Sequence, residues 1–288
     1  MKIVFLCSEY PPSDAGGIGV VLKGLCEGIS ASGHEVHVVG SYRSADAGVD
    51  VCNGVTIHRL PRRPGPSGVL IDRWRVWRCC REIGRSGPID ILEAPDFEAP
   101  GALLPRMSRR RIVRLHGSQT YFAKERHLTP PRSIKFFENW QLAHADAWIS
   151  VSGYTARETV RIFDLQRPTH VLHNCPALPL DAKRKTEHET RRRAVYFGTL
   201  TEKKGVFALA RAWRAFHAVC PEWTLTFMGR DAVLGGRSVK DQIIEMLGEA
   251  VGSVSFAGPV ENGNLLRRLP DFDFAVLPSY SEAFAMAP

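Results

Sequence analysis

Two adjacent lysines, Lys203 and Lys204, stand in the segment Gly198–Gly205, just before a helical pattern begins. The N-terminus of a helix carries a partial positive charge, so two lysines there are unfavourable unless an anion lies close to them. Glycine allows the backbone to approach a ligand closely, and lysine adds a point charge that suits phosphate. The segment therefore predicts an anion site, with a pair of solvated lysines as the alternative.

A single acid, Glu282, follows the apolar run Phe274–Leu277 near the end of the sequence. A carboxylate beyond the end of a strand can accept hydrogen bonds from the hydroxyl groups of a ligand. If a helix begins at Glu282, the free N–H groups of Phe284, Ala285 and Met286 face a phosphate. The alternative is an acid that only stabilises the start of that helix, which is common.

A glycine-rich segment containing Gly16 and Gly17 follows the first apolar run, Ile3–Cys7, and precedes a helical pattern. Its backbone N–H groups and the helix N-terminus can hold a phosphate, although a plain turn between strand and helix explains the glycines equally well. The spacing is not that of the dinucleotide-binding motif, because the third glycine is replaced by Leu22 and no acid ends the second strand. A nicotinamide-dependent enzyme is therefore disfavoured.

One histidine, His116, directly follows the apolar run Ile112–Leu115. At the carboxyl end of a strand, its imidazole is placed to hydrogen-bond a ligand. A histidine that only belongs to a turn is the more frequent case for such a residue taken alone.

Apolar runs alternate with helical patterns along the whole chain, which predicts a parallel, doubly wound sheet in an α/β protein. A charged, proline-containing stretch at 177–193 interrupts the alternation. We therefore expect a first domain over 1–176, a linker over 177–193 and a second domain over 194–288. The expected strands are Ile3–Cys7, Glu35–Val39, Val55–Leu60, Ile89–Glu93, Ile112–Leu115, Ala147–Val151, His170–Leu172, Ala194–Gly198, Thr224–Met228, Ser253–Ala257 and Phe274–Leu277.

The composition, with 44% hydrophobic and 24% charged residues in 288, is that of a globular protein of two ordinary domains. No apolar stretch is long enough to span a membrane, and the first apolar run is too short for a signal peptide, so we expect a cytoplasmic protein. Seven cysteines without a C-x-x-C pair predict reduced core thiols. Neither a disulfide nor a metal site is expected.

The net charge of +8 is concentrated in arginines of the first half of the chain. A basic face can serve nucleic acid, anionic lipid or a phosphorylated substrate, but a solvated surface is at least as common. No nucleic-acid-binding motif accompanies the charge, so we expect no nucleic-acid partner. The helical pattern Ile71–Ile83 carries Trp74 and Trp77 among arginines, which suits a peripheral contact with a membrane. The more ordinary arrangement has the tryptophans packed inward and the arginines solvated.

Taken together, these motifs resemble family-four glycosyltransferases of the GT-B type, nearly from end to end. The matching segments are Pro11–Pro12 and Gly16–Gly19, Gly33–Val38, Leu115–Gly117, Ala145–Ser152, Val171–Asn174, Gly198–Gly205 and Pro278–Phe284. The resemblance implies two Rossmann-like domains that face a cleft. It also implies a retaining transferase that moves a sugar from a nucleoside-diphosphate sugar to a glycan, lipid-linked or small-molecule hydroxyl, with no bound cofactor and no metal.

The resemblance also implies roles for particular residues. Glu282 and His116 are the expected catalytic residues, with Glu282 on the sugar hydroxyls and His116 on the transferred sugar or the acceptor. Lys204 is expected to neutralise the diphosphate leaving group. The remaining residues expected to bind the sugar nucleotide are Gly16, Gly17, Gly198, Thr199, Lys203, Phe284 and Ala285.

The sequence departs from the family pattern at three places. Thr199 stands where the family often has arginine, so the second charge on the diphosphate falls to Lys203, and Ala285 replaces a glycine. The family's second glutamate would stand at position 290, so we expect an incomplete second domain. Three alternatives to transfer remain open: a related nucleotide-sugar epimerase, a phosphorylase with a pyridoxal cofactor, and a non-catalytic fragment that binds a nucleotide sugar.

Overall fold

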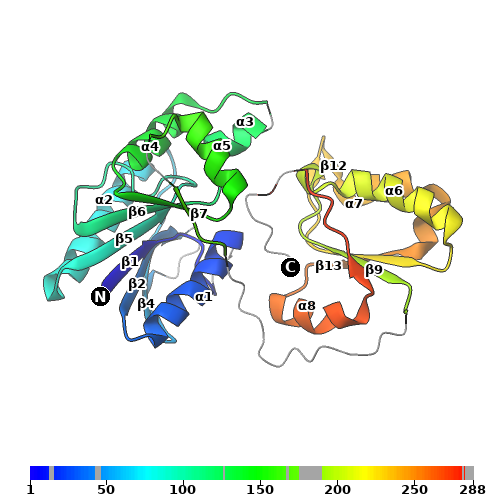
Figure 1. Ribbon diagram of the computed structural model, residues 1–288, viewed down its shortest axis with the longest axis horizontal. Helices are drawn as coiled ribbons and strands as arrows, with labels where there is room; N and C mark the ends of the chain where they lie inside the picture. Colours follow the sequence, from blue (N-terminus) through cyan, green and yellow to red (C-terminus); the bar gives the residue numbers. More distant parts are fainter. Residues whose placement is uncertain are drawn as a thin grey trace. The chain divides into compact units, whose positions relative to one another are not determined.

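A computed structural model describes residues 1–12, 16–42, 47–125, 127–166, 169–174, 190–280 and 282 of the chain. The chain forms two compact units, Met1–Leu178 and Pro179–Pro288 (Figure 1). Most of the expected linker, 177–193, lies outside the described residues. Each unit is an α/β structure built on a parallel sheet, so the expected fold class is confirmed.

The first unit contains an eight-stranded sheet in the order β3-β4-β2-β1-β5-β6-β7-β8. All neighbouring pairs are parallel except β3 and β4. The sequence did not predict β3, because all five of its residues are exposed and no apolar run marks it. The strands are β1 (Lys2–Leu6), β2 (Glu35–Tyr42), β3 (Gly48–Cys52), β4 (Val55–Pro61), β5 (Ile89–Pro95), β6 (Ser108–Leu115), β7 (Ala147–Ser150) and β8 (Thr169–Val171).

Both faces of this sheet are buried, as its continuous apolar strands require. Ile3 and Phe5 of β1 pack with residues of α1 on one face. Val4 and Leu6, which alternate with them, pack with residues of α2 on the other face. The helices of the unit are α1 (Gly17–Ala31), α2 (Pro66–Ile83), α3 (Gln119–Glu125), α4 (Arg132–Ala143) and α5 (Gly153–Phe163), with a 3-10 turn, η1 (Gly84–Ser86).

The second unit has a four-stranded parallel sheet in the order β13-β10-β9-β14. Figure 1 shows α6 and α7 on one side of this sheet and α8 on the other. Tyr196 and Phe227 of the sheet pack against α6 and α7 in a single apolar cluster. The elements are β9 (Arg193–Phe197), η2 (Glu202–Lys204), α6 (Val206–Val219), β10 (Thr224–Met228), β11 (Val233–Leu234), β12 (Arg237–Ser238), α7 (Val239–Leu247), η3 (Gly248–Ser253), β13 (Val254–Gly258), α8 (Asn262–Arg268), η4 (Leu269–Asp271) and β14 (Phe274–Ala275).

The tryptophans of α2 differ from the ordinary expectation. Trp77 packs against the apolar cluster under α2, but Trp74 is 53% exposed, so the inward orientation is wrong for Trp74. Arg78 lies over the ring of Trp74, which keeps an apolar surface next to a cation at the surface. Within the described part of the chain, no helix combines the length and apolar character needed to cross a membrane.

Two arginines expected on a solvated face are instead buried in ion pairs. Arg114 of β6 bonds Glu93 of β5 through both Nε, at 2.6 Å, and Nη2, at 3.2 Å. Arg59 of β4, which is 5% exposed, pairs with Asp50 of β3. Each arginine lies on the strand next to the one that carries its partner acid. Because both arginine side chains are buried, the expectation of a solvated arginine is wrong for these two residues.

The Glu93–Arg114 pair gives a test of the first unit's packing. Glu93→Met leaves the Arg114 guanidinium buried without its anion, which costs roughly 3–5 kcal/mol of unfolding free energy. The double variant Glu93→Met/Arg114→Met removes both charges and is expected to recover most of that loss. Urea unfolding measures both, with Glu82→Met in the exposed Glu82–Arg85 pair as the control, at about 0–1 kcal/mol. A loss for Glu93→Met no larger than the control contradicts this account.

Candidate functional site

The segment Gly198–Gly205, here called the lysine loop, connects β9 to α6 in the second unit. Gly205, which follows Lys204, has a φ of +71°, a left-handed conformation that favours glycine. A Cβ atom at Gly205 would lie 2.0 Å from the carbonyl oxygen of Pro278. Glycine is therefore required there, because it lets the lysine loop touch the backbone of the loop that follows β14.

An ion pair joins these two loops. Lys204 Nζ contacts Glu282 Oε1, and the Ser279 hydroxyl donates to the same carboxylate oxygen at 2.8 Å. The N–H of Tyr280 donates to the carbonyl oxygen of Lys203 at 3.0 Å. The Lys204 and Glu282 side chains are 35% and 28% exposed, so both remain accessible to a ligand. Two residues that the sequence predicted separately therefore lie in direct contact.

The order of strands explains why these loops meet. β9 and β14 are neighbours in the sheet, with Phe274 paired to Ala194 and Ala275 to Val195. Since they run parallel, their carboxyl ends lie at the same edge, and the loops after them lie side by side. A cation on one loop and a carboxylate on the other then form a polar pair at that edge.

Gly198 and Thr199 lie at the start of the lysine loop. Gly198 has a φ of +140°, and its N–H donates to the carbonyl oxygen of Met228 at 2.9 Å. The Thr199 carbonyl accepts a hydrogen bond from the buried Tyr196 hydroxyl at 3.0 Å. These contacts fix the backbone of the loop, while the Thr199 side chain stays exposed.

The glycine segment of the first unit is held by an acid that the sequence analysis missed. The Glu9 carboxylate accepts the N–H of Gly16 and the N–H of Gly19, both at 3.2 Å. Burial raises the pKa of Glu9, while the two N–H groups oppose that shift. The N–H of Gly16 therefore already has Glu9 as its acceptor, so the expectation that it is free to bind a phosphate is wrong. Gly17 is exposed at the first position of α1.

His116 follows β6, and a buried acid fixes the turn in which it lies. The two oxygens of Asp96 accept the N–H groups of His116, at 2.8 Å, and Gly117, at 3.1 Å. Burial, together with the positive charge of Arg114, lowers the pKa of His116 to about 3. Its imidazole is therefore neutral near neutral pH, and it can both donate and accept a hydrogen bond. Burial also raises the pKa of Asp96 to about 7.

A second buried acid, Glu138 of α4, holds the start of α3. It accepts the N–H of Gln119 at 2.8 Å and that of Thr120 at 3.2 Å, and it is 1% exposed. Sequence reasoning missed this residue as well as Asp96. Their partners lie about twenty positions away along the chain, so no local spacing indicates the contact.

Two of the residues expected to bind the sugar nucleotide lie in a part of the chain that the structure does not describe. They are Phe284 and Ala285, and the helix expected to begin at Glu282 is likewise outside the described residues.

Over the parts of the chain that are described, no three His, Cys, Asp or Glu side chains gather into a metal-binding group. Cys7, Cys26 and Cys80 are buried free thiols, but Cys52 is exposed on β3, so the core placement is wrong for Cys52.

The sequence and structure match known proteins. The model of glycosyltransferase family 4 matches residues 15–175. An uncharacterized glycosyltransferase of Methanocaldococcus jannaschii is 25% identical over 313 residues, covering 99% of this chain and 76% of its own. Sucrose-phosphate synthase from Thermosynechococcus elongatus matches with a TM-score of 0.73 at 17% identity, covering 99% of this chain and 77% of its own. Anabaena HepE, solved with UDP and glucose, matches with a TM-score of 0.70 at 16% identity, covering 99% and 76%.

The low pKa of His116 predicts how acid affects stability. In the unfolded chain a histidine binds its proton below about pH 6.5, whereas the folded chain holds His116 neutral down to its lowered pKa. Unfolding therefore takes up a proton in that window, and the wild type loses stability as the pH falls. His116→Gln cannot take up this proton, so it is expected to lose less unfolding free energy from about pH 7.5 to about pH 5.

Urea denaturation of both proteins at the two pH values measures this difference. Asp96, whose pKa is raised on folding, titrates in the opposite sense but is present in both proteins and cancels in the comparison. Equal losses in the wild type and in His116→Gln would show that the imidazole titrates normally in the folded chain.

Proposed function

Because the chain belongs to glycosyltransferase family 4, we propose that it transfers a sugar from a nucleoside diphosphate to an acceptor hydroxyl, with retention of anomeric configuration. The chain is a glycosyltransferase of the GT-B fold. The observation that carries the proposal is the contact of Lys204 with Glu282 at the carboxyl edge of the second unit's sheet. One residue there suits a diphosphate and the other suits sugar hydroxyls.

Lys204 acts on the leaving group. When the bond between the anomeric carbon and the phosphate oxygen breaks, the nucleoside diphosphate leaves with the electron pair. A fixed cation next to that oxygen stabilises the developing negative charge. Lys204 is only about a third exposed and is aligned by Glu282, so its position is set before the donor binds. Lys203 supplies a further positive charge to the diphosphate. The N–H of Gly198 is already bonded to the carbonyl oxygen of Met228, so Gly198 shapes the loop and does not bind the diphosphate through that group.

Glu282 binds the sugar. The Ser279 hydroxyl already bonds its carboxylate, which leaves acceptor positions for hydroxyl groups of the donor sugar. In the transfer, the acceptor oxygen bonds to the anomeric carbon on the face from which the diphosphate leaves. The acceptor proton passes to the oxygen of the departing diphosphate, so configuration is retained and no protein base is needed.

The first unit, taken by itself, also carries groups that suit the hydroxyls of a sugar. The neutral His116 imidazole can donate to one hydroxyl and accept from another, which a charged ring could not do. Gly17 offers an exposed N–H at the start of α1, while Glu9 holds the neighbouring Gly16. HepE, solved with UDP and glucose, supports a nucleotide-sugar donor for this fold. The acceptor is a glycan, a lipid-linked hydroxyl or a small molecule.

Substitution of the paired residues tests the site. With UDP-, GDP- and ADP-sugars as donors, Lys204→Ala is expected to lower the release of nucleoside diphosphate by at least about 100-fold. Glu282→Gln, which loses charged hydrogen bonds to the sugar, is expected to lower it by roughly 10-fold or more. Lys23→Ala, on an exposed face of α1, is the matched control and should keep the wild-type rate.

NMR of the product then gives the anomeric configuration, which is expected to equal that of the donor. Wild-type turnover in both site variants would remove Lys204 and Glu282 from the site. Nucleotide-sugar binding without release of diphosphate from any donor would instead support the non-catalytic binder.

A further inference from the structure

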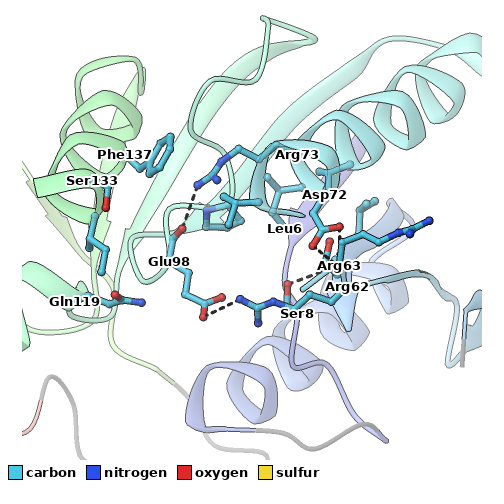
Figure 2. Close-up of a pocket in the computed structure, with 17 residues that line it drawn as sticks. Leu6, Ser8, Arg62, Arg63, Asp72, Arg73, Glu98, Gln119, Ser133 and Phe137 are labelled. Atoms are coloured by element: carbon cyan, nitrogen blue, oxygen red, sulfur yellow. Dashed lines mark hydrogen bonds and ion pairs between the residues drawn. The ribbon is translucent and has the colours of Figure 1, made fainter. Parts of the chain in front are cut away.

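A pocket of about 280 Å³ opens within the first unit, beside the ends of β1 and β2 and between α2 and α4 (Figure 2). Ser8, just after β1, and Ser41, near the end of β2, line it, and Gln119, three residues after His116, lines it from the start of α3. Its volume is near the lower end of the ~300–1,000 Å³ usual for small-molecule sites, which fits a group of about one sugar ring. Nothing in the proposed donor chemistry uses this pocket.

Arg73 of α2 is the fixed cation of the pocket. Its Nη2 donates to the carbonyl oxygens of Ala99, at 3.1 Å, and Glu98, at 3.5 Å, and its guanidinium lies 4.2 Å from the ring centroid of Phe137. Its Nε is buried and has no hydrogen-bond partner among the described residues. A buried donor left unpaired is unfavourable, and burial lowers the pKa of the guanidinium. An anion bound beside the guanidinium would favour its charged form and so oppose the effect of burial on its pKa.

Arg62 is the adjustable cation of the pocket. Its Nη2 lies 3.5 Å from Glu98 Oε1, and the two side chains are 36% and 38% exposed. Figure 2 shows both side chains pointing toward one another in the pocket, whereas Arg63 points away from it. A contact this long and exposed is weak, so a ligand anion can replace it at small cost. Asp72, which also lines the pocket, accepts the backbone N–H of Arg63, and among the described residues no ion pair joins it to Arg62 or Arg73.

The backbone at Glu98, which lines the pocket, has an unfavourable conformation. Glu98 and Ala99 have φ values of 60° and 44°, a left-handed conformation unfavourable for residues other than glycine. The two hydrogen bonds from Arg73 hold these carbonyl groups in place. The strain presents the Glu98 carboxylate beside Arg62, where it can accept a hydroxyl once the cation turns to a ligand. The pocket thus offers cations for an anion and a carboxylate for a hydroxyl.

We propose that this pocket binds the acceptor through a phosphate group held by Arg62 and Arg73, with an acceptor hydroxyl on Glu98. The inference rests on the proposed transfer reaction and narrows its acceptor to a phosphate ester of about monosaccharide size. Guanidinium groups suit phosphate because they offer parallel N–H donors that match its oxygens. Val69, Val76 and Phe137 provide an apolar wall for the body of the ligand.

Calorimetric titration of the whole chain tests the phosphate contact. The probes are glucose, mannose and fructose, each against its 6-phosphate. At least one phosphate is expected to bind about 10-fold or more tightly than its parent sugar. Arg62→Gln and Arg73→Lys should each lower that preference by about 10-fold, because the first removes a charge and the second removes the fork of donors. Arg85→Gln, in the 3-10 turn η1 that follows α2 and 73% exposed, removes the same charge and should leave the preference unchanged.

Circular dichroism shows whether Arg73→Lys still folds, and Arg62→Gln, whose side chain is partly exposed, carries the test if it does not. A second arm uses vesicles of phosphatidylcholine with or without phosphatidylinositol. Vesicle binding that needs Arg62 identifies the phosphate as that of a lipid head group, whereas binding of hexose phosphates alone identifies a soluble acceptor.

The inference is overturned if neither the sugar phosphates nor the vesicles show binding that depends on Arg62 and Arg73. These measurements do not involve the donor, so failure of diphosphate release leaves them valid. If instead transfer to a sugar 6-phosphate proceeds at the wild-type rate in Arg62→Gln, the inference fails while the proposed transferase stands.

Discussion

The contact between Lys204 and Glu282 depends on one close approach of backbone to backbone. β9 and β14 run parallel as neighbours, and Gly205 allows the loop after β9 to reach the carbonyl oxygen of Pro278 in the loop after β14. Any side chain at Gly205 would separate the loops, and with them Lys204 and Glu282. The ion pair is therefore a consequence of sheet topology and of one glycine, and its two charges, at a single sheet edge, are those that we propose for the diphosphate and the sugar.

In the first unit, carboxylates that accept backbone N–H groups hold the loops at the ends of the strands. The buried carboxylates of Asp96 and Glu138 and the partly buried carboxylate of Glu9 accept backbone N–H groups of the loops that carry His116, Gln119 and Gly16. Each carboxylate pairs with backbone N–H groups that would otherwise lack an acceptor, and each thereby positions a loop. These hydrogen bonds hold the backbone of each loop without a ligand. Arg73 differs from these acids, since its Nε is buried and finds no hydrogen-bond partner in the described part of the chain, and its guanidinium lies beside an open pocket.

Much of the fold follows from the sequence, because strands covered on both faces read as continuous apolar runs. The strands missed by this criterion are those without a buried face, such as β3, whose five residues are all exposed. Helix α3 was missed because Glu138 of another helix fixes its start. In the site, the residue types of Lys204 and Glu282 were readable, but their contact was not, since it requires the pairing of β14 with β9. The acids that hold the loops have partners far along the chain and leave no local pattern.

The most direct test of the account is the affinity of the chain for UDP, GDP and ADP against the matching monophosphates. If Lys204 faces the diphosphate, at least one diphosphate binds about 10-fold or more tightly than its monophosphate, and Lys204→Ala removes that preference while monophosphate binding stays unchanged. Equal affinities for every pair, or a preference that survives Lys204→Ala, would contradict the placement of the donor at the Lys204–Glu282 edge.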